Sequence, residues 1–164
     1  MAVLVKVELD TPKIGKRRLA TIQREANRAT MLYHAQTNLP KHFEENALTR
    51  PGGPYGFKRR SKKYLIRKAR ATGQTAPNVY TGRMREIVLA NPENKITATQ
   101  HRSRFVAPGA LHFPLSPDRR KQYLAEMEVV TDYERGNLSR LQAAAVRRGI
   151  DDHLKSDRRR NRTR

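Results

Sequence analysis

The scarcity of apolar side chains beside a large excess of positive charge is the feature that most constrains this fold. Leu, Ile, Val and Phe supply 33 of the 164 residues, and 35 Lys and Arg stand against 15 Asp and Glu, which gives a net charge of +20. Chains with this apolar content and this much charge lie near the boundary with disorder. A small core that completes its burial against neighbouring subunits or nucleic acid is therefore expected.

The same charge points to binding rather than catalysis. A chain of charge +20 repels itself, so nucleic acid or acidic protein surfaces are the expected partners. The absence of Cys excludes disulfides and thiolate metal sites, and the five His residues lack the spacing of metal ligands. No cofactor and no small-molecule substrate are expected. The apolar runs are too short for a membrane span or a signal peptide, so a soluble protein inside a cell is expected.

An α+β fold is predicted as a single domain over residues 1–156, with a small antiparallel sheet packed against a long N-terminal helix and C-terminal helices. The expected strands are 2–10, 87–90 and 95–100, with 101–106 continuing the last one. The expected helices are 16–38, 61–71, a turn at 82–86, 117–130 and, after a bend at Gly136, 137–154. Long loops are expected at about 41–57 and 107–116. Residues 157–164 contain five Arg and no apolar side chain, which predicts a disordered basic tail.

Positive charge is concentrated in one segment. The forty residues between Glu45 and Glu86 contain no carboxylate and eleven Lys or Arg, eight of them within 58–70. Such side chains bind nucleic acid by releasing counterions from phosphates, without reading base sequence. The predicted nucleic-acid-binding residues come from this segment and the tail: Lys58, Arg59, Arg60, Lys62, Lys63, Arg67, Lys68, Arg70, Arg158, Arg159 and Arg160. A solvated basic helix and a contact with acidic protein remain alternative interpretations of the segment.

A phosphodiester-cleaving enzyme is the catalytic alternative. The adjacent acids Glu44, Glu45, Asp151 and Asp152 are the residues that would hold its divalent ion. Neighbouring carboxylates are far more often ordinary surface charge. The glycine-rich stretch 51–56 lacks both the spacing and the Lys-Ser/Thr ending of a phosphate-binding loop. A non-enzymatic protein is therefore expected.

One stretch of the chain resembles a known family. Over residues 59–133, a basic helix, a linker, the segment 76–87, a strand hairpin and a closing helix resemble the tail-completion and neck proteins of tailed bacteriophages. That family has the pattern Pro-x-x-Thr-Gly-x-Leu-x-x-Ser-Ile. The corresponding residues here are Pro77, Thr81, Gly82, Met84 and Ile87. Glu86 stands in place of the serine, the spacing from Pro to Thr is one residue longer, and the spacing from Met84 to Ile87 is one residue shorter than in the pattern.

The resemblance implies a structural subunit of a virion, assembled in the host cytoplasm. It implies a homo-oligomeric ring at the head–tail junction, around a channel that carries DNA, with other head–tail junction proteins as neighbours. Non-specific charge contacts with the DNA backbone would follow, and Thr81 and Gly82 would be turn residues without a catalytic role. The alternative left open by the same basic segments is a general nucleic-acid-binding protein, such as a ribosome-associated or nucleoid protein.

Overall fold

The computed structural model describes residues 14–44, 55, 60–75, 83–106, 118, 121 and 128–162. Its elements in chain order are α1 (Lys16–Tyr33), the π-helix η1 (His34–Asn38), the 3-10 helix η2 (Leu39–Phe43), α2 (Lys62–Thr72), α3 (Arg83–Leu89), the 3-10 helix η4 (Pro92–Lys95), β1 (Ile96–Ala98), β2 (Ser103–Phe105) and α5 (Asp132–Arg162). The predicted strand at 2–10 and loop at 107–116 lie outside the described residues, as does most of the predicted helix at 117–130.

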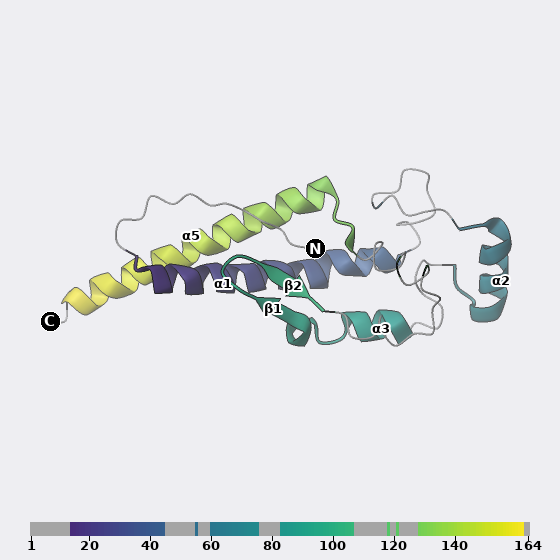
Figure 1. The fold of residues 1–164 in the computed structure, drawn as a ribbon, viewed down its shortest axis with the longest axis horizontal. Coiled ribbons are helices and arrows are strands. Elements are labelled where there is room, and N and C mark those ends of the chain that lie inside the picture. The colour runs from purple at the N-terminus through teal and green to yellow at the C-terminus, as the bar shows by residue number, and fades with distance from the viewer. Residues whose placement is uncertain are drawn as a thin grey trace.

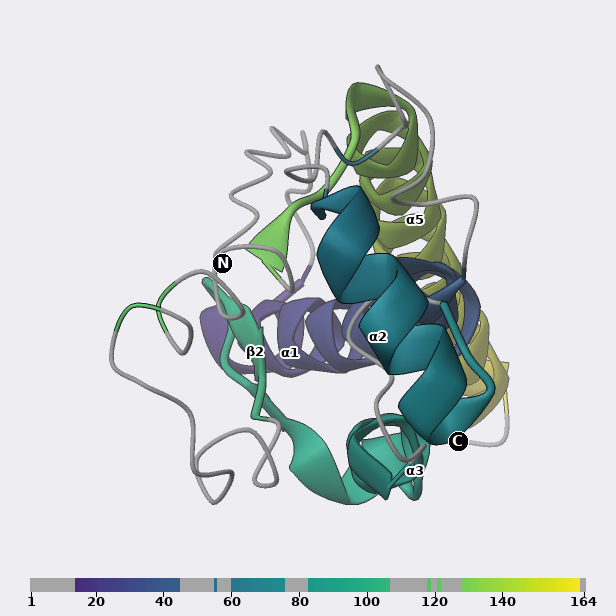
Figure 2. The same cartoon turned by 90° about the vertical axis from the view of Figure 1, so that its right-hand side faces the viewer.

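Two long helices form the axis of the molecule. Helices α1 and α5 lie side by side, the two strands and α3 follow one side of α1, and α2 stands at one end (Figure 1). The view along the long axis shows α2 crossing that end of the molecule (Figure 2). Strands β1 and β2 pair antiparallel and pack against α1. The predicted α+β fold, with a small antiparallel sheet on a long N-terminal helix, is confirmed.

The N-terminal helix agrees with its predicted extent and then continues. Helical backbone runs through α1 and η1 to Asn38, which confirms the helix predicted at 16–38. Pro40 does not end the helical course of the chain, because the 3-10 helix η2 continues to Phe43. Proline is tolerated there because it lies in the first turn of η2, where no backbone N–H is needed. Residues 41–43 of the expected loop at 41–57 are thus in η2, and most of its remaining residues lie outside the described part of the chain.

Helix α5 is longer than predicted at both ends. Its start is a capping box, in which Glu134 N donates to Thr131 Oγ1 over 3.2 Å and Thr131 N donates to Glu134 Oε2 over 3.0 Å. The helix passes straight through Gly136, so the predicted bend is wrong. It also continues over 157–162, where a disordered tail was predicted. Arginine has a high helix propensity, and cations near a helix C-terminus are favoured by the macrodipole, so this tail extends the helix.

A small apolar cluster joins α1 to α5. Its buried members are Ile22, Ala26, Val146 and Ile150, and Ile14, Leu19, Ala145 and Leu154 pack around them. Gly149 lies at the closest approach, since a Cβ there would sit 2.7 Å from Ile22 Cγ2. A second cluster consists of Leu39, Phe43 and Val88, with Leu89 and Phe105 against it. Both clusters are small, and other buried apolar side chains, such as Met31, Ala35 and Leu138, lie outside them.

The hairpin lies later in the chain than the sequence suggested. Residues 87–90 were predicted to be its first strand, but Ile87 to Leu89 belong to α3. The expected strand at 95–100 and its continuation instead form β1 and β2, with Ile96 opposite Phe105. A short apolar run fits a buried helix turn as well as a strand, so periodicity alone does not separate them.

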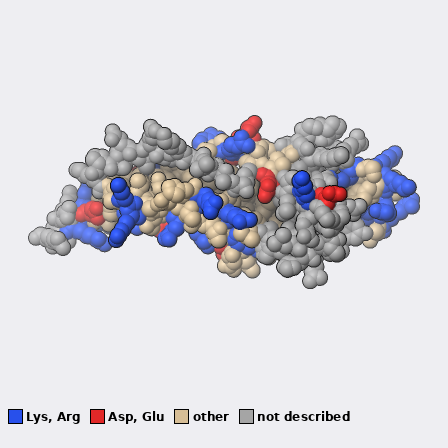
Figure 3. All heavy atoms as spheres, in the orientation of Figure 1, with Lys and Arg blue, Asp and Glu red and all other residues tan. Residues whose placement is uncertain are grey.

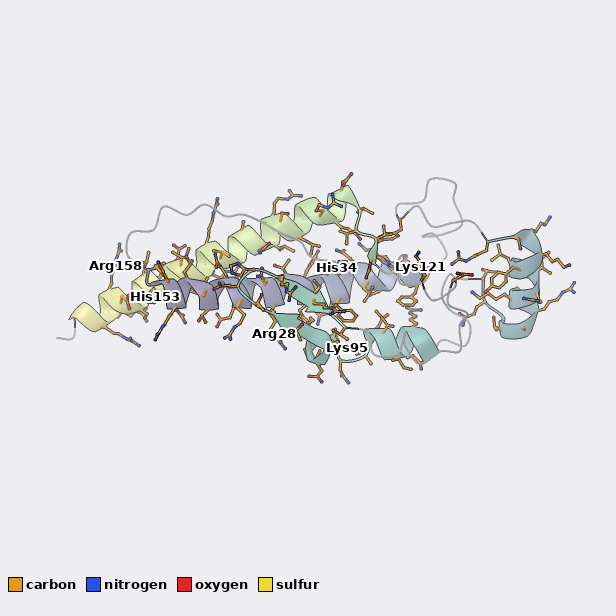
Figure 4. All side chains as sticks on the ribbon, in the orientation of Figure 1. Arg28, His34, Lys95, Lys121, His153 and Arg158 are labelled. Carbon is orange, nitrogen blue, oxygen red and sulfur yellow. The ribbon has the colours of Figure 1, made fainter. Side chains whose placement is uncertain are left out.

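Polar side chains attach the hairpin to its neighbours. The Lys95 ammonium donates to the carbonyls of Ile87, Val88 and Ala90 and so satisfies the C-terminal end of α3. Burial lowers the pKa of Lys95, and Glu93 opposes this shift. The Arg28 guanidinium of α1 donates to the carbonyls of Ile96 and Glu93, at 3.0 and 2.9 Å. Arg28 and Lys95 both lie along the hairpin in Figure 4.

The contact at Gly149 can be tested with a matched pair of glycines in α5. Gly149→Ala is expected to lower the free energy of unfolding by about 1–3 kcal/mol through overpacking against Ile22. Gly136→Ala has open space around its Cβ and is expected to raise this free energy by up to about 1 kcal/mol, because alanine favours helix. Urea unfolding followed by circular dichroism measures both. Equal effects of the two substitutions would contradict the close contact between α1 and α5.

Candidate nucleic-acid interface

Helix α2 is built by clear start and stop signals. Ser61 caps its N-terminus, where the Ser61 hydroxyl accepts from Tyr64 N over 3.3 Å. Gly73 ends it in a left-handed conformation at φ 69°, and Gly73 N donates to Ala69 O over 2.8 Å. These bounds confirm the helix predicted at 61–71. Among the described elements, none packs extensively against α2.

The outer face of α2 is basic and exposed. Positions 62, 63, 66, 67 and 70 lie on one side of a helix of 3.6 residues per turn. The residues at these positions are Lys62, Lys63, Ile66, Arg67 and Arg70, and all of them are exposed. We call this surface the α2 face. It presents four cations around one apolar side chain, and α2 contains no acidic residue.

The structure sorts the predicted binding residues of this segment into three groups. Four of them lie on the α2 face. Lys68 is only 4% exposed, so its ammonium is not part of the surface that a phosphate chain would meet. Arg60 is half-buried, and Lys58 and Arg59 lie outside the described residues. The basic surface on α2 therefore contains four of the eight residues predicted for this segment.

The predicted tail residues lie at the opposite end of the molecule. Arg158, Arg159 and Arg160 are exposed near the end of α5, which projects beyond the start of α1 (Figure 1). The α+β fold therefore separates the two predicted groups of cations and does not combine them into one surface. Arg158 and His153 are labelled at this end in Figure 4. His153 Nε2 lies 3.3 Å from an Asp157 carboxylate oxygen on the less exposed side of α5.

Three cations at the same end were missed by the sequence analysis. Lys16, Arg17 and Arg18 form the first turn of α1, are exposed, and have no acidic residue among them. Because α1 and α5 run antiparallel, this turn lies beside the C-terminal half of α5. The combined surface is called the C-terminal pole, and its residues are Lys16, Arg17, Arg18, Lys155, Arg158, Arg159 and Arg160. Three consecutive cations at a helix start were the available signal in the sequence.

The acids of the catalytic alternative do not form a metal site in the described part of the chain. Asp151 and Asp152 are exposed on the outer side of α5, in a shallow hollow that also contains Arg147 and Lys155. Glu44 is exposed after η2, and Glu45 lies outside the described residues. Within the described ranges, no group of three or more His, Asp or Glu side chains is arranged to hold a metal ion.

A buried polar cluster lies where the N-terminal helices meet the start of α5. Tyr55 donates its hydroxyl proton to Glu134 Oε1 over 2.6 Å, and its ring lies against His42 with centroids 4.1 Å apart. His34 Nδ1 lies 3.3 Å from Asn38 Nδ2 in the π-helix. Burial, reinforced by the hydrogen bond to Glu134, raises the pKa of Tyr55 and keeps it a donor. The cluster fixes Tyr55 to both helical elements, and sequence periodicity gave no sign of it.

No family model, curated protein or solved structure matches the chain. Of the helices that the structure describes, none is long and apolar enough to cross a membrane.

The hydrogen bond of Tyr55 can be tested by removing its hydroxyl. Tyr55→Phe is expected to lower the free energy of unfolding by about 1.5–3 kcal/mol, the usual range for a hydrogen bond to a charged group. Glu134 is 4% exposed and would lose a donor without regaining water. Tyr133→Phe is the matched control, because Tyr133 is 74% exposed, and it should be neutral. Thermal and urea unfolding measure both, and an unchanged stability in Tyr55→Phe would contradict the anchoring contact.

The buried His34 predicts a loss of stability in mild acid. Burial lowers its pKa below the ordinary 6.5, although Glu134 opposes the shift. The unfolded state then binds more protons than the folded state, so the free energy of unfolding falls as the pH drops from 6.5 towards the lowered pKa. His34→Gln should flatten this dependence, whereas His101→Gln, at an exposed site, should not. Urea unfolding at several pH values from about 7.5 to about 5, on both sides of the ordinary His pKa, measures how the free energy of unfolding changes with pH.

Proposed function

We propose that this protein is a non-enzymatic structural subunit of a bacteriophage virion at the head–tail junction, in which copies form a ring around the DNA channel. The exposed α2 face carries the proposal, because it offers a basic surface that the rest of the described subunit does not cover. The resemblance of the segment 76–87 to tail-completion and neck proteins gives the setting. Part of that motif lies outside the described residues, and Ile87 lies in α3.

Charge and helix geometry support a DNA contact by α2. Four exposed cations occupy about two and a half turns of helix, roughly 12 Å along its axis. Duplex DNA carries one negative charge per about 1.7 Å, so such a face meets several phosphates at once. Contacts of this kind hold DNA without regard to sequence, as the wall of a channel requires. Each subunit of a ring would repeat the contact.

The division of the core supports assembly. The two buried clusters are small, while several large apolar side chains are exposed. These are Tyr33, Ile66, Val106, Tyr133 and Leu141. Tyr133 and Leu141 both lie on α5, and a neighbouring subunit or another head–tail junction protein would cover them at low cost in desolvation. Burial between subunits would supply stability that the small core lacks.

A general nucleic-acid-binding protein is the second candidate. The C-terminal pole favours it, because a ring subunit needs one surface towards the channel and this molecule has a further basic surface at its other end. A monomer with two such surfaces fits a nucleoid protein or a ribosome-associated protein. Oligomeric state separates the two candidates.

Native mass spectrometry of the full chain, with and without a short duplex, tests the ring. A closed oligomer of one size is expected. Leu141→Ser with Tyr133→Ser should shift it towards monomer and lower the melting temperature, because the stabilising burial between subunits is lost. Lys62→Gln, Lys63→Gln and Arg67→Gln together should weaken DNA binding and leave the oligomer intact, because their side chains are exposed on α2. A monomer at every concentration, in both the presence and the absence of DNA, would contradict the ring.

A further inference from the structure

Two groups of exposed cations lie at opposite ends of the elongated molecule, and other exposed cations, such as Arg85, Arg102 and Arg104, lie between them. Figure 3 shows Lys and Arg side chains over α2 at one end and over the α1–α5 pair at the other. These two surfaces are the α2 face and the C-terminal pole. In the latter, α5 extends past the start of α1, so its last turns present cations around a free helix end (Figure 1). The C-terminal pole also has acids: an Asp157 carboxylate oxygen lies 3.3 Å from His153 Nε2, and Asp151 and Asp152 are exposed earlier on α5, in the same shallow hollow as Lys155.

The surface between the two ends carries mixed charge. Exposed acids occur on α1, α3, η4 and at the start of α5: Glu25, Glu86, Glu93 and Asp132. Both acidic and basic side chains are visible over this middle region in Figure 3. A carboxylate repels a phosphate chain, so the middle of the molecule binds it less well than either end. One duplex lying along the whole molecule would have to pass these acids. A duplex at either end would instead meet Lys and Arg in excess over Asp.

The two ends suit a duplex better than a single strand. Proteins that bind single strands combine cations with aromatic platforms on which bases stack. The α2 face has no aromatic residue, since Tyr64 lies on the less exposed side of α2. The segments 14–18 and 154–160, which include the cations of the C-terminal pole, contain no aromatic residue either. Cations without stacking partners fit the phosphates of duplex DNA.

The helices hold the two ends apart. α1 and η1 together cover 16–38 without a break, a length of about 35 Å at 1.5 Å per residue. The contact of Gly149 with Ile22 holds α5 against α1, and Gln142 Nε2 donates to Asn27 Oδ1 across the same pair. The separation greatly exceeds the Debye length of about 8 Å at physiological salt. A phosphate chain bound at one end therefore leaves the field at the other end almost unchanged.

We propose that one copy of this protein bridges two segments of duplex DNA, one on the α2 face and one on the C-terminal pole. The bridge needs no ring, because both surfaces belong to the same chain. It also needs no sequence preference, because both contacts are to phosphates. In a virion or in a nucleoid, such a protein would hold neighbouring DNA segments at a fixed spacing.

Capture of a second duplex tests the bridge. A biotinylated duplex on beads is incubated with full-length protein and a fluorescent duplex of a different sequence, and fluorescence anisotropy measures binding to one duplex separately. Lys62→Gln with Lys63→Gln and Arg67→Gln changes the α2 face, and Arg17→Gln with Lys155→Gln and Arg158→Gln changes the C-terminal pole. Each triple variant should lower capture about tenfold or more and should still bind one duplex.

A matched variant controls for net charge. Arg85→Gln, Arg102→Gln and Arg104→Gln remove the same number of exposed cations from between the two ends, and capture should stay near that of the unchanged protein. Equal losses in all three variants would show an effect of net charge alone and would overturn the bridge.

Two further outcomes would also overturn it. In the first, only one of the two end variants loses both capture and duplex binding. A single surface would then bind DNA, and any capture would come from oligomers. This result would not contradict the ring proposal. The α2 variant could instead keep both duplex capture and duplex binding but lose binding to an acidic polyglutamate chain. The α2 face would then bind acidic protein and not DNA. Failure of the ring in native mass spectrometry, by contrast, leaves the capture assay unaffected.

Discussion

The close packing of α5 on α1 is the contact on which the rest of the described structure depends. It requires a glycine at 149, because any Cβ there would enter the space of Ile22. With the two helices in place, Asn27 Nδ2 donates to the carbonyls of Thr99 and Gln100, at 2.8 and 3.2 Å, while its carbonyl accepts from Gln142. One buried amide thus links α1, α5 and the hairpin turn. A chain with so few apolar residues uses such polar links where a larger protein would use more core.

The same packing determines where the charge lies. Each long helix has enough apolar residues for one face only, so its cations are on the outside and at its ends. Antiparallel pairing then brings the basic first turn of α1 next to the basic last turns of α5. Neither group is beside the other in the sequence. The C-terminal pole is therefore a product of tertiary structure, whereas the α2 face is contained within one helix and depends on local signals alone.

This difference explains which parts of the structure were predictable from the sequence. The helices at 16–38 and 61–71 were predicted correctly, because each has apolar periodicity, and the second also has Ser61 and Gly73 as its cap residues. The strand at 87–90 was wrong, because three consecutive apolar residues have no period. A bend was predicted at Gly136 and a disordered tail at the arginine run, yet a glycine lowers helix stability by only about 1 kcal/mol and arginine favours helix. Tertiary contacts, such as Tyr55 with Glu134, have no signature in the sequence.

Separation of the two basic surfaces also makes the high net charge tolerable. Like charges destabilise a compact protein most when they share one surface, and screening removes most of their repulsion beyond about 8 Å at physiological salt. Cations placed at opposite ends of a pair of long helices therefore repel one another little across the molecule. Each cluster keeps its own local repulsion, which a phosphate chain relieves. The two surfaces together hold 11 of the 35 Lys and Arg residues, so their placement at opposite ends of the fold removes one part of the repulsion that a net charge of +20 brings.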